Sequence, residues 1–130
     1  MLEAVGLFLM HFATGVVLTA AFVVSYAALT PQPELKLIRA GSAAAALGVG
    51  GATLGFVIPL ALVLSLTANP LEASAWGAVS LVVQLLGLLV TRLLVPNLAA
   101  DITDGKMSAA VVQAMAGVGL GLLQAASWVP

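Results

Sequence analysis

The sequence predicts an all-α, polytopic membrane protein with four transmembrane helices, and two observations carry this prediction. Hydrophobic residues make up 62% of the 130-residue chain, charged residues only 7%, and the mean hydropathy is +1.21. A soluble domain has about 25% charged residues, so this composition excludes that class. Asp, Glu, Lys and Arg are also absent from four windows, each long enough for one spanning helix. The windows are 4–33, 40–71, 73–91 and 107–130.

The first window predicts a helix over residues 4–29. Thr30 precedes Pro31, and a residue before proline is pushed out of helical geometry, so the helix should end there. Residues 31–40 (PQPELKLIRA) mix charged and apolar side chains, which predicts a short amphipathic segment at the membrane surface. Gly41 then allows the chain to turn into the next span.

The second window predicts a helix over residues 42–66 with Pro59 inside it. A proline removes one backbone hydrogen bond and kinks a helix, and membrane helices tolerate this where neighbours satisfy the freed carbonyl. Residues 67–74 (TANPLEAS) have the composition of a turn, punctuated by Asn and Pro.

Two more spans follow, predicted over residues 75–95 and 107–127. Between them, residues 96–106 (PNLAADITDGK) form a second predicted surface connection. Trp76 and Trp128 stand near the ends of these spans, where tryptophan anchors a helix at the membrane interface.

The chain also repeats itself, which predicts one transmembrane domain built from two parallel two-helix halves, residues 4–67 and 69–130. Each half reads as helix, proline, short surface segment, glycine and small-residue helix. Two such halves share one orientation, so an axis along the membrane normal should relate them. The matching residues, offset by 64 or 65 positions, are Pro31 and Pro96, Ile38 and Ile102, Gly41 and Gly105, Gly55 and Gly119, and Ala61 and Ala125.

The basic residues predict the orientation of the chain. Lys36, Arg39, Arg92 and Lys106 all flank the first and third connections, and neither terminus nor the second connection carries any. Because basic residues concentrate on the cytoplasmic side, both termini are expected in the periplasm.

Two sets of residues, one in each half, have an order and spacing that resembles a known family. The first set is Tyr26, Thr30-Pro31, Glu34, Leu37-Ile38, Gly41, Ala44-Ala45, Gly51, Leu54-Gly55 and Pro59-Leu60. The second set is Trp76-Gly77, Gln84, Arg92-Leu93, Pro96, Ile102 and Ala125-Ala126. The chain resembles the YjfL-like family of small bacterial inner-membrane proteins, known as domain of unknown function 350. The resemblance implies a four-helix protein of the bacterial inner membrane with a tandem repeat, and it implies no particular activity.

Small residues form one face on each of two predicted helices. Gly and Ala side chains let helix backbones approach closely in a membrane. This predicts that the two faces pack either on each other within the chain or on another subunit. The face residues are Gly48, Gly51, Gly55, Gly117, Gly121 and Ala125.

Four polar side chains lie within the predicted spans: His11, Gln84, Gln113 and Gln124. Polar groups are costly at that depth, so each should have a partner. Two interpretations remain open, namely hydrogen bonds between helices and a polar lining for a small solute. No carboxylate lies mid-membrane, which disfavours a conventional ion-coupled transporter.

Charged residues gather at the predicted cytoplasmic ends of the spans, where Glu34, Arg39 and Arg92 mark a cytoplasmic rim. Three interpretations are open. The side chains are solvated, or Glu34 and Arg92 pair and join the two halves, or the rim is a docking or lipid-headgroup site.

The composition argues against chemistry at a built active site. The chain has no cysteine and one histidine, so we expect no catalytic residues, no metal site, no cofactor and no enzyme activity. A net charge of −1 gives no basic surface that would bind nucleic acid.

The leading functional prediction is a structural or scaffolding component of the envelope. It would act as a homo-oligomer, with a dimer favoured, and contact the lipid bilayer and a cytoplasmic protein partner at the rim. The alternative is a small transporter, flippase or channel with a pathway between repeats or subunits.

Overall fold

This computed structural model describes residues 1–128, which form six helices and no strand. The four long helices are α1 (Leu2–Leu29), α3 (Ala43–Leu66), α4 (Pro70–Leu94) and α6 (Met107–Ser127). The two short helices are α2 (Glu34–Arg39) and α5 (Leu98–Thr103). All four long helices have the length and composition of membrane spans, which confirms the predicted fold class.

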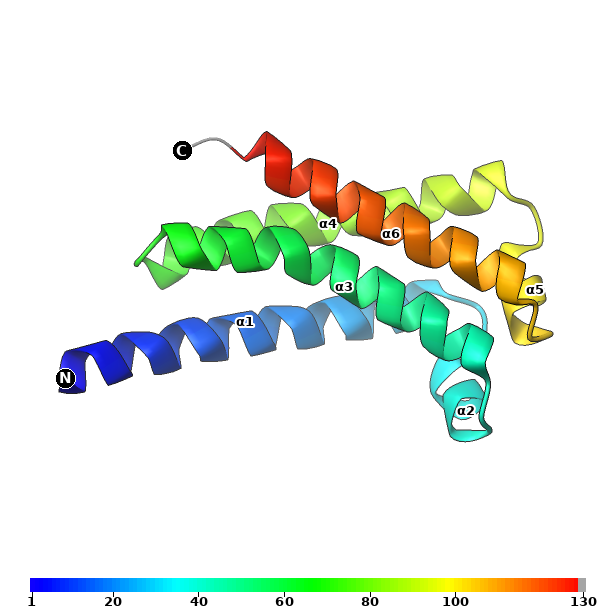
Figure 1. Cartoon of the computed structure of the whole chain (residues 1–130), viewed down its shortest axis with the longest axis horizontal. Helices are drawn as coiled ribbons and strands as arrows, with labels where there is room; N and C mark the ends of the chain where they lie inside the picture. The colour runs from blue at the N-terminus through cyan, green and yellow to red at the C-terminus, as the bar shows by residue number, and fades with distance from the viewer. Residues whose placement is uncertain (129–130) are drawn as a thin grey trace.

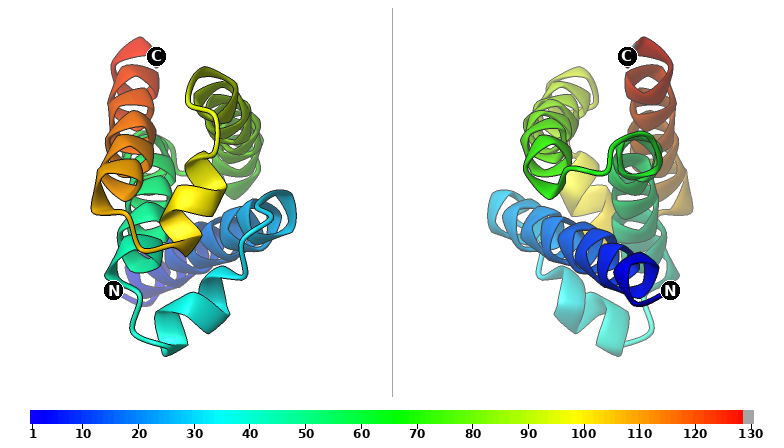
Figure 2. Two further views of the ribbon diagram at one scale, coloured as in Figure 1. Left: turned by 90° about the vertical axis from the view of Figure 1, so that its right-hand side faces the viewer. Right: turned by 90° about the vertical axis from the view of Figure 1, so that its left-hand side faces the viewer.

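The long helices lie side by side, and both short helices lie at one end of them (Figure 1). We call that end the rim. The N-terminus and the last turn of α6 lie at the opposite end. Viewed end-on, α1 runs at an angle to the other long helices (Figure 2). Its 28 residues make it about 42 Å long, more than the ~30 Å hydrocarbon core, and a tilt accommodates such excess length.

Local capping places the start of α4 earlier than the composition predicted. The predicted turn over residues 67–74 and helix start at residue 75 are wrong, because α4 begins at Pro70. Proline suits the first position of a helix, where its missing N–H is not needed. The Asn69 side chain accepts a hydrogen bond from the N–H of Leu71 at 3.0 Å and so caps the helix. The connection between α3 and α4 is therefore only Thr67–Asn69.

Each short helix is followed by a glycine with a left-handed backbone, Gly41 at φ +90° and Gly105 at φ +81°. Only glycine adopts this conformation without strain, so each turn directs the chain into a long helix. Residues 96–106 were predicted as a short surface connection, and they contain α5. Its Leu98 and Ile102 are fully buried with the alanines at the start of α3 and α6.

The closest helix pair is α3 and α6, which meet through the predicted small-residue faces. A Cβ on Gly51 would overlap the backbone of Ala114, and one on Gly55 would overlap the carbonyl of Gly117. On Gly117, a Cβ would lie 3.2 Å from the Cα of Ala52. The faces thus pack on each other within one chain.

The remaining positions around this pair differ in their surroundings. A Cβ on Gly48 would lie 2.9 Å from Nε2 of Gln113, and Ala125 is half-buried one turn beyond Gly121. Gly119, the repeat counterpart of Gly55, has no atom within 4 Å of such a Cβ. Gly55 therefore makes its close contact with Gly117 and Gly121, and not with Gly119, the residue 64 positions later in the sequence.

Pro59 explains why the contact centres on Gly55. Proline has no N–H, so Pro59 cannot donate to the carbonyl four residues earlier, that of Gly55. That carbonyl instead faces Gly121, where a Cβ would overlap it. A Cα–H group of Gly121 is the weak donor available to it. Pro59 is buried, whereas the other predicted kink or turn residues, Pro31 and Pro96, are exposed.

Aromatic rings brace the bundle at two depths. Phe22 of α1 stacks on Phe56 of α3 with ring centroids 4.8 Å apart, in a core that also contains Leu60 and Leu88. Trp76 and Trp128, predicted as separate anchors, touch edge to face at 6.0 Å and join α4 to the end of α6.

Candidate functional site

A series of buried polar side chains runs through the bundle, and Gln84 of α4 lies at its centre. The Gln84 side chain is 4% exposed. Its Nε2 donates to the carbonyl of Gly117 at 2.9 Å, and its Oε1 accepts from Nε2 of Gln124 at 2.6 Å. Both partners belong to α6, so this amide ties α4 to α6 at the level of the glycine contact.

A second amide, Gln113, ties α6 to α1. It is 3% exposed, and its Nε2 donates to the hydroxyl of Tyr26, which is itself buried. Oε1 of Gln113 is buried and has no hydrogen-bond partner. We refer to Gln124, Gln84, Gln113, Tyr26 and Glu34 together as the polar axis.

A small cavity separates the two halves of the polar axis. Its volume is about 20 Å³, and Gln84, Gln113 and Tyr26 contribute to its lining together with apolar residues such as Phe22. This is room for about one water molecule, which needs two to four polar partners. The axis therefore contains a single-water gap at its middle.

At the rim the axis ends in a buried carboxyl group. Glu34 of α2 is 6% exposed, and its Oε1 has no hydrogen-bond partner. Burial raises the pKa of Glu34 to about 7, and the hydroxyls of Tyr26 and Thr30 and the charge of Arg92 offset only part of this effect. At neutral pH a large fraction of this carboxyl is therefore protonated.

Arg92, in the last turn of α4, contacts the chain where α1 ends. Its Nη1 donates to the carbonyl of Leu29 at 2.8 Å, and its Nη2 lies 3.5 Å from Oε1 of Gln32. The guanidinium forms no ion pair with Glu34, so the interpretation of a direct Glu34–Arg92 pair is wrong. Glu34 is instead buried next to the hydroxyls of Tyr26 and Thr30. Arg92 instead joins α4 to the segment that follows α1.

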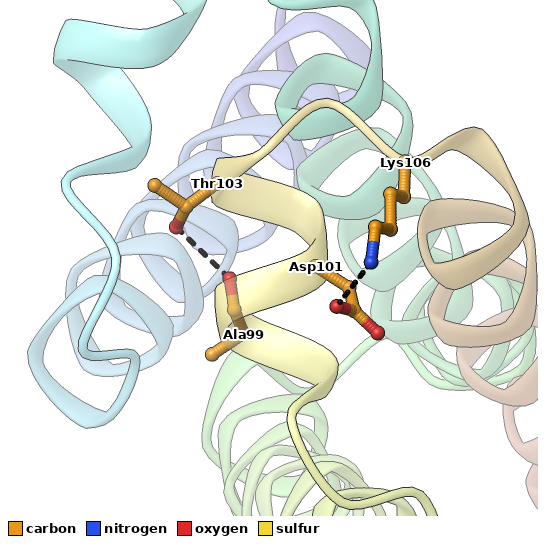
Figure 3. Close-up of polar contacts among 4 residues, drawn as sticks. All are labelled: Ala99, Asp101, Thr103 and Lys106. Carbon is orange, nitrogen blue, oxygen red and sulfur yellow. Dashed lines mark hydrogen bonds and ion pairs between the residues drawn. The ribbon is translucent and has the colours of Figure 1, made fainter.

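Among residues 1–128 one ion pair forms, and it lies at the rim. Nζ of Lys106 lies 3.2 Å from Oδ1 of Asp101, and the hydroxyl of Thr103 donates to the carbonyl of Ala99 at 2.9 Å (Figure 3). The Lys106 side chain is 60% exposed, so this pair contributes at most about 1 kcal/mol. Arg39 is exposed and lies outside the polar axis.

His11 is the polar residue that the structure places apart from the others. Its Nε2 lies 2.7 Å from the carbonyl oxygen of Thr67, and its Nδ1 lies 2.9 Å from that of Leu7. A neutral imidazole carries one N–H, so it donates to one of these two carbonyls. Its contact with Thr67 places His11 where α1 meets the end of α3, far from the rim.

Sequence reasoning missed two members of this site. Tyr26 was noted only for the family resemblance, although it is the one tyrosine of the chain and stands near the end of a span. Gln32 lay in a segment predicted to be at the surface, yet it is 6% exposed. The sequence did contain a signal for an ordered position of Gln32. Prolines on both sides of it restrict the backbone to a narrow range of conformations.

The chemistry available to these groups is hydrogen bonding and proton binding. No group of three or more His, Cys, Asp or Glu that could hold a metal ion occurs within residues 1–128. The fold and the polar axis define a polytopic, helical membrane protein with four spans and polar side chains between them.

Comparison with known proteins places the chain within a family. It belongs to the family described as Domain of Unknown Function (DUF350), whose profile matches residues 1–128. It is 32% identical over 125 residues to the "UPF0719 inner membrane protein YjfL" of Escherichia coli K12, a match that covers 96% of this chain and 95% of the relative. The protein of the same name from Escherichia coli O157:H7 matches equally. No solved structure matches the chain. The chain is therefore an inner-membrane protein.

Proposed function

We propose that the protein is a structural, scaffolding component of the inner membrane that acts as a homo-oligomer. One observation carries this proposal, namely the closed polar axis. Gln84 and Gln124 are bonded to each other, Gln84 is bonded to backbone and Gln113 to Tyr26. The space left between them holds about one water molecule. A single chain therefore offers a solute no continuous path, which favours a scaffold over a channel or transporter.

The exposure of α1 supports the oligomer. Phe22 and Tyr26 are the only buried residues among its 28. Val17 is 66% exposed and faces away from the core. A second copy of the chain would pack on this uncovered side of α1 through van der Waals contact, which drives helix association in lipid.

Disulfide cross-linking tests the oligomer, and the absence of native cysteine makes the background clean. We expect Val17→Cys to form a covalent dimer on oxidation in native membranes. Leu123→Cys, equally exposed at 66% but on α6, is the matched control and should stay monomeric. A cross-link at Leu123 alone would show that the interface lies on α6 and not on α1. If the protein is a monomer in mild detergent and neither position forms a cross-link, the proposal of a homo-oligomer is wrong.

The charge distribution supports an orientation with the rim in the cytoplasm and both termini in the periplasm. Lys36, Arg39, Arg92 and Lys106 all stand in or next to the connections at the rim, and basic residues concentrate on the cytoplasmic side. The exposed part of this charged rim is also the surface we propose for a cytoplasmic protein partner.

Thiol labelling of intact cells checks this orientation. Single cysteines at Glu3 and Asn69 should react with a membrane-impermeant maleimide, while a cysteine at Lys36 should react only after the cells are lysed. Labelling of Lys36→Cys in intact cells, with the other two protected, would invert the orientation.

A further inference from the structure

A second cavity, which the scaffold proposal does not use, opens at the rim. It has a volume of about 550 Å³ and lies between the segment after α1, the end of α4 and helix α5. Its lining includes Gln32 and Arg92 as well as Asn97 and the apolar Pro31 and Leu98. We call it the rim pocket.

The rim pocket is bordered by hydrogen-bond donors that the protein leaves without acceptors. Nε of Arg92 is buried and has no hydrogen-bond partner. The same holds for Nε2 of Gln32, a residue that is only 6% exposed. Of the five N–H groups of Arg92, only two are accounted for, by Leu29 and Gln32. Unsatisfied buried donors are costly, so an acceptor that enters the rim pocket and reaches them would stabilise this arrangement.

The charge of Arg92 points to an anionic acceptor. Within residues 1–128, no carboxylate oxygen lies within 4 Å of its guanidinium. The neighbouring carboxyl is that of Glu34, and burial raises its pKa to about 7, so it neutralises Arg92 only in part. Guanidinium groups bind phosphate in a forked geometry, with two parallel N–H···O bonds.

The surroundings of the rim pocket point to a phosphate that belongs to a lipid. Leu93 and Leu94, next to Arg92, are 81% and 76% exposed, as expected for side chains that face acyl chains. A second groove of about 320 Å³ shares Gln32 and Pro33 with the rim pocket, and Glu34 and Lys36 of α2 also line it. It continues along α1 and α3 past Val23, Val24 and Val49. A pocket with polar donors at the end of the spans thus meets a groove whose α1 and α3 walls are apolar and lead toward the membrane centre.

We propose that the rim pocket binds the phosphate group of an anionic phospholipid, with Arg92 and Gln32 as its donors and one acyl chain along the groove between α1 and α3. Basic pockets between helices at the cytoplasmic face are a known way to hold lipid headgroups. This site does not depend on the oligomer, because every residue in it belongs to one chain.

The test uses the full chain purified in dodecyl maltoside and measures retained lipid by native mass spectrometry. Titration with dioleoylphosphatidylglycerol should give one retained lipid per chain, with at least tenfold weaker binding for Arg92→Gln and several-fold weaker binding for Gln32→Leu. Arg39→Gln is the matched control, since it removes the same charge from an exposed position at the same end. It should bind like the unchanged chain. Equal loss in Arg92→Gln and Arg39→Gln, or no loss in either, would overturn the site.

Two further arms separate a lipid from other sources of phosphate. Inorganic phosphate at millimolar concentration should not displace the lipid; displacement would show a site for soluble anions and overturn the proposal. Val24→Trp should block the groove, weakening dioleoylphosphatidylglycerol but not the short-chain dihexanoyl lipid. Val24 is 69% exposed, so this variant should fold even if Arg92→Gln does not. Equal binding of both lipids by Val24→Trp would exclude the groove.

Discussion

Replacing Gly55 with alanine should destabilise the folded bundle by about 1–3 kcal/mol, the range for forcing an extra group into a packed interface. The added methyl group would overlap the Gly117 carbonyl and Nε2 of Gln84 at once. Neither can move freely, because the carbonyl is part of α6 and the amide is bonded to it. The measurement is thermal or denaturant unfolding of the purified protein in detergent, with oligomeric state recorded alongside.

Gly50→Ala is the control for this experiment. It lies on the same helix, and no atom stands within 4 Å of the Cβ it would gain. Alanine favours a helix over glycine by up to about 1 kcal/mol, so the control should be neutral or slightly stabilised. On α6, Gly121→Ala and Gly119→Ala should differ in the same way. If Gly55→Ala unfolds like Gly50→Ala, α3 and α6 do not meet through this face.

The second large effect is expected at the centre of the polar axis. Gln84→Leu removes two hydrogen bonds, each worth about 0.6 kcal/mol on average in a membrane, and strands the amide of Gln124. We therefore expect a loss of about 1–2 kcal/mol in unfolding free energy. The double variant Gln84→Leu/Gln124→Leu should recover part of this loss, because no amide is then left without its partner.

The same pair of variants tests the closed axis. In a scaffold, the double variant should assemble like the unchanged chain in the cross-linking experiment. If Gln84 lined a solute pathway, Gln84→Leu would keep its unfolding free energy and change only flux into liposomes. That result would favour the transporter alternative.

The number and place of the spans could be read from the sequence because they depend on local composition. Four charge-free windows gave four helices, and the fourth was predicted with the bounds it has, Met107–Ser127. Errors arose where a helix extends beyond its apolar window. Pro70 to Ser74 includes Glu72 and reads as a turn, yet Asn69 caps it and proline starts it. The small-residue faces were also local patterns, and they proved to lie at the closest helix contact.

The partners in the polar axis could not be read in this way, because they depend on how deeply each helix sits and how it is rotated. Gln84 and Gln124 are 40 positions apart, and Tyr26 and Gln113 are 87 apart. Nothing local to either residue indicates the other. Glu34 was predicted at the rim but not as buried, because its burial depends on how α2 packs on α3.

The pairing of α3 with α6 has a consequence for how the chain is made. Leu66, at the end of α3, is followed by 61 residues before α6 ends at Ser127. At about 5–20 residues per second, a ribosome needs roughly 3–12 s to complete that stretch. During this interval α3 is already synthesised while the helix that covers its glycines is not. A nascent chain that stopped after α5 would leave the side of Gly51 and Gly55 that faces α6 uncovered. The glycine face of α3 is thus covered only once α6 has been synthesised.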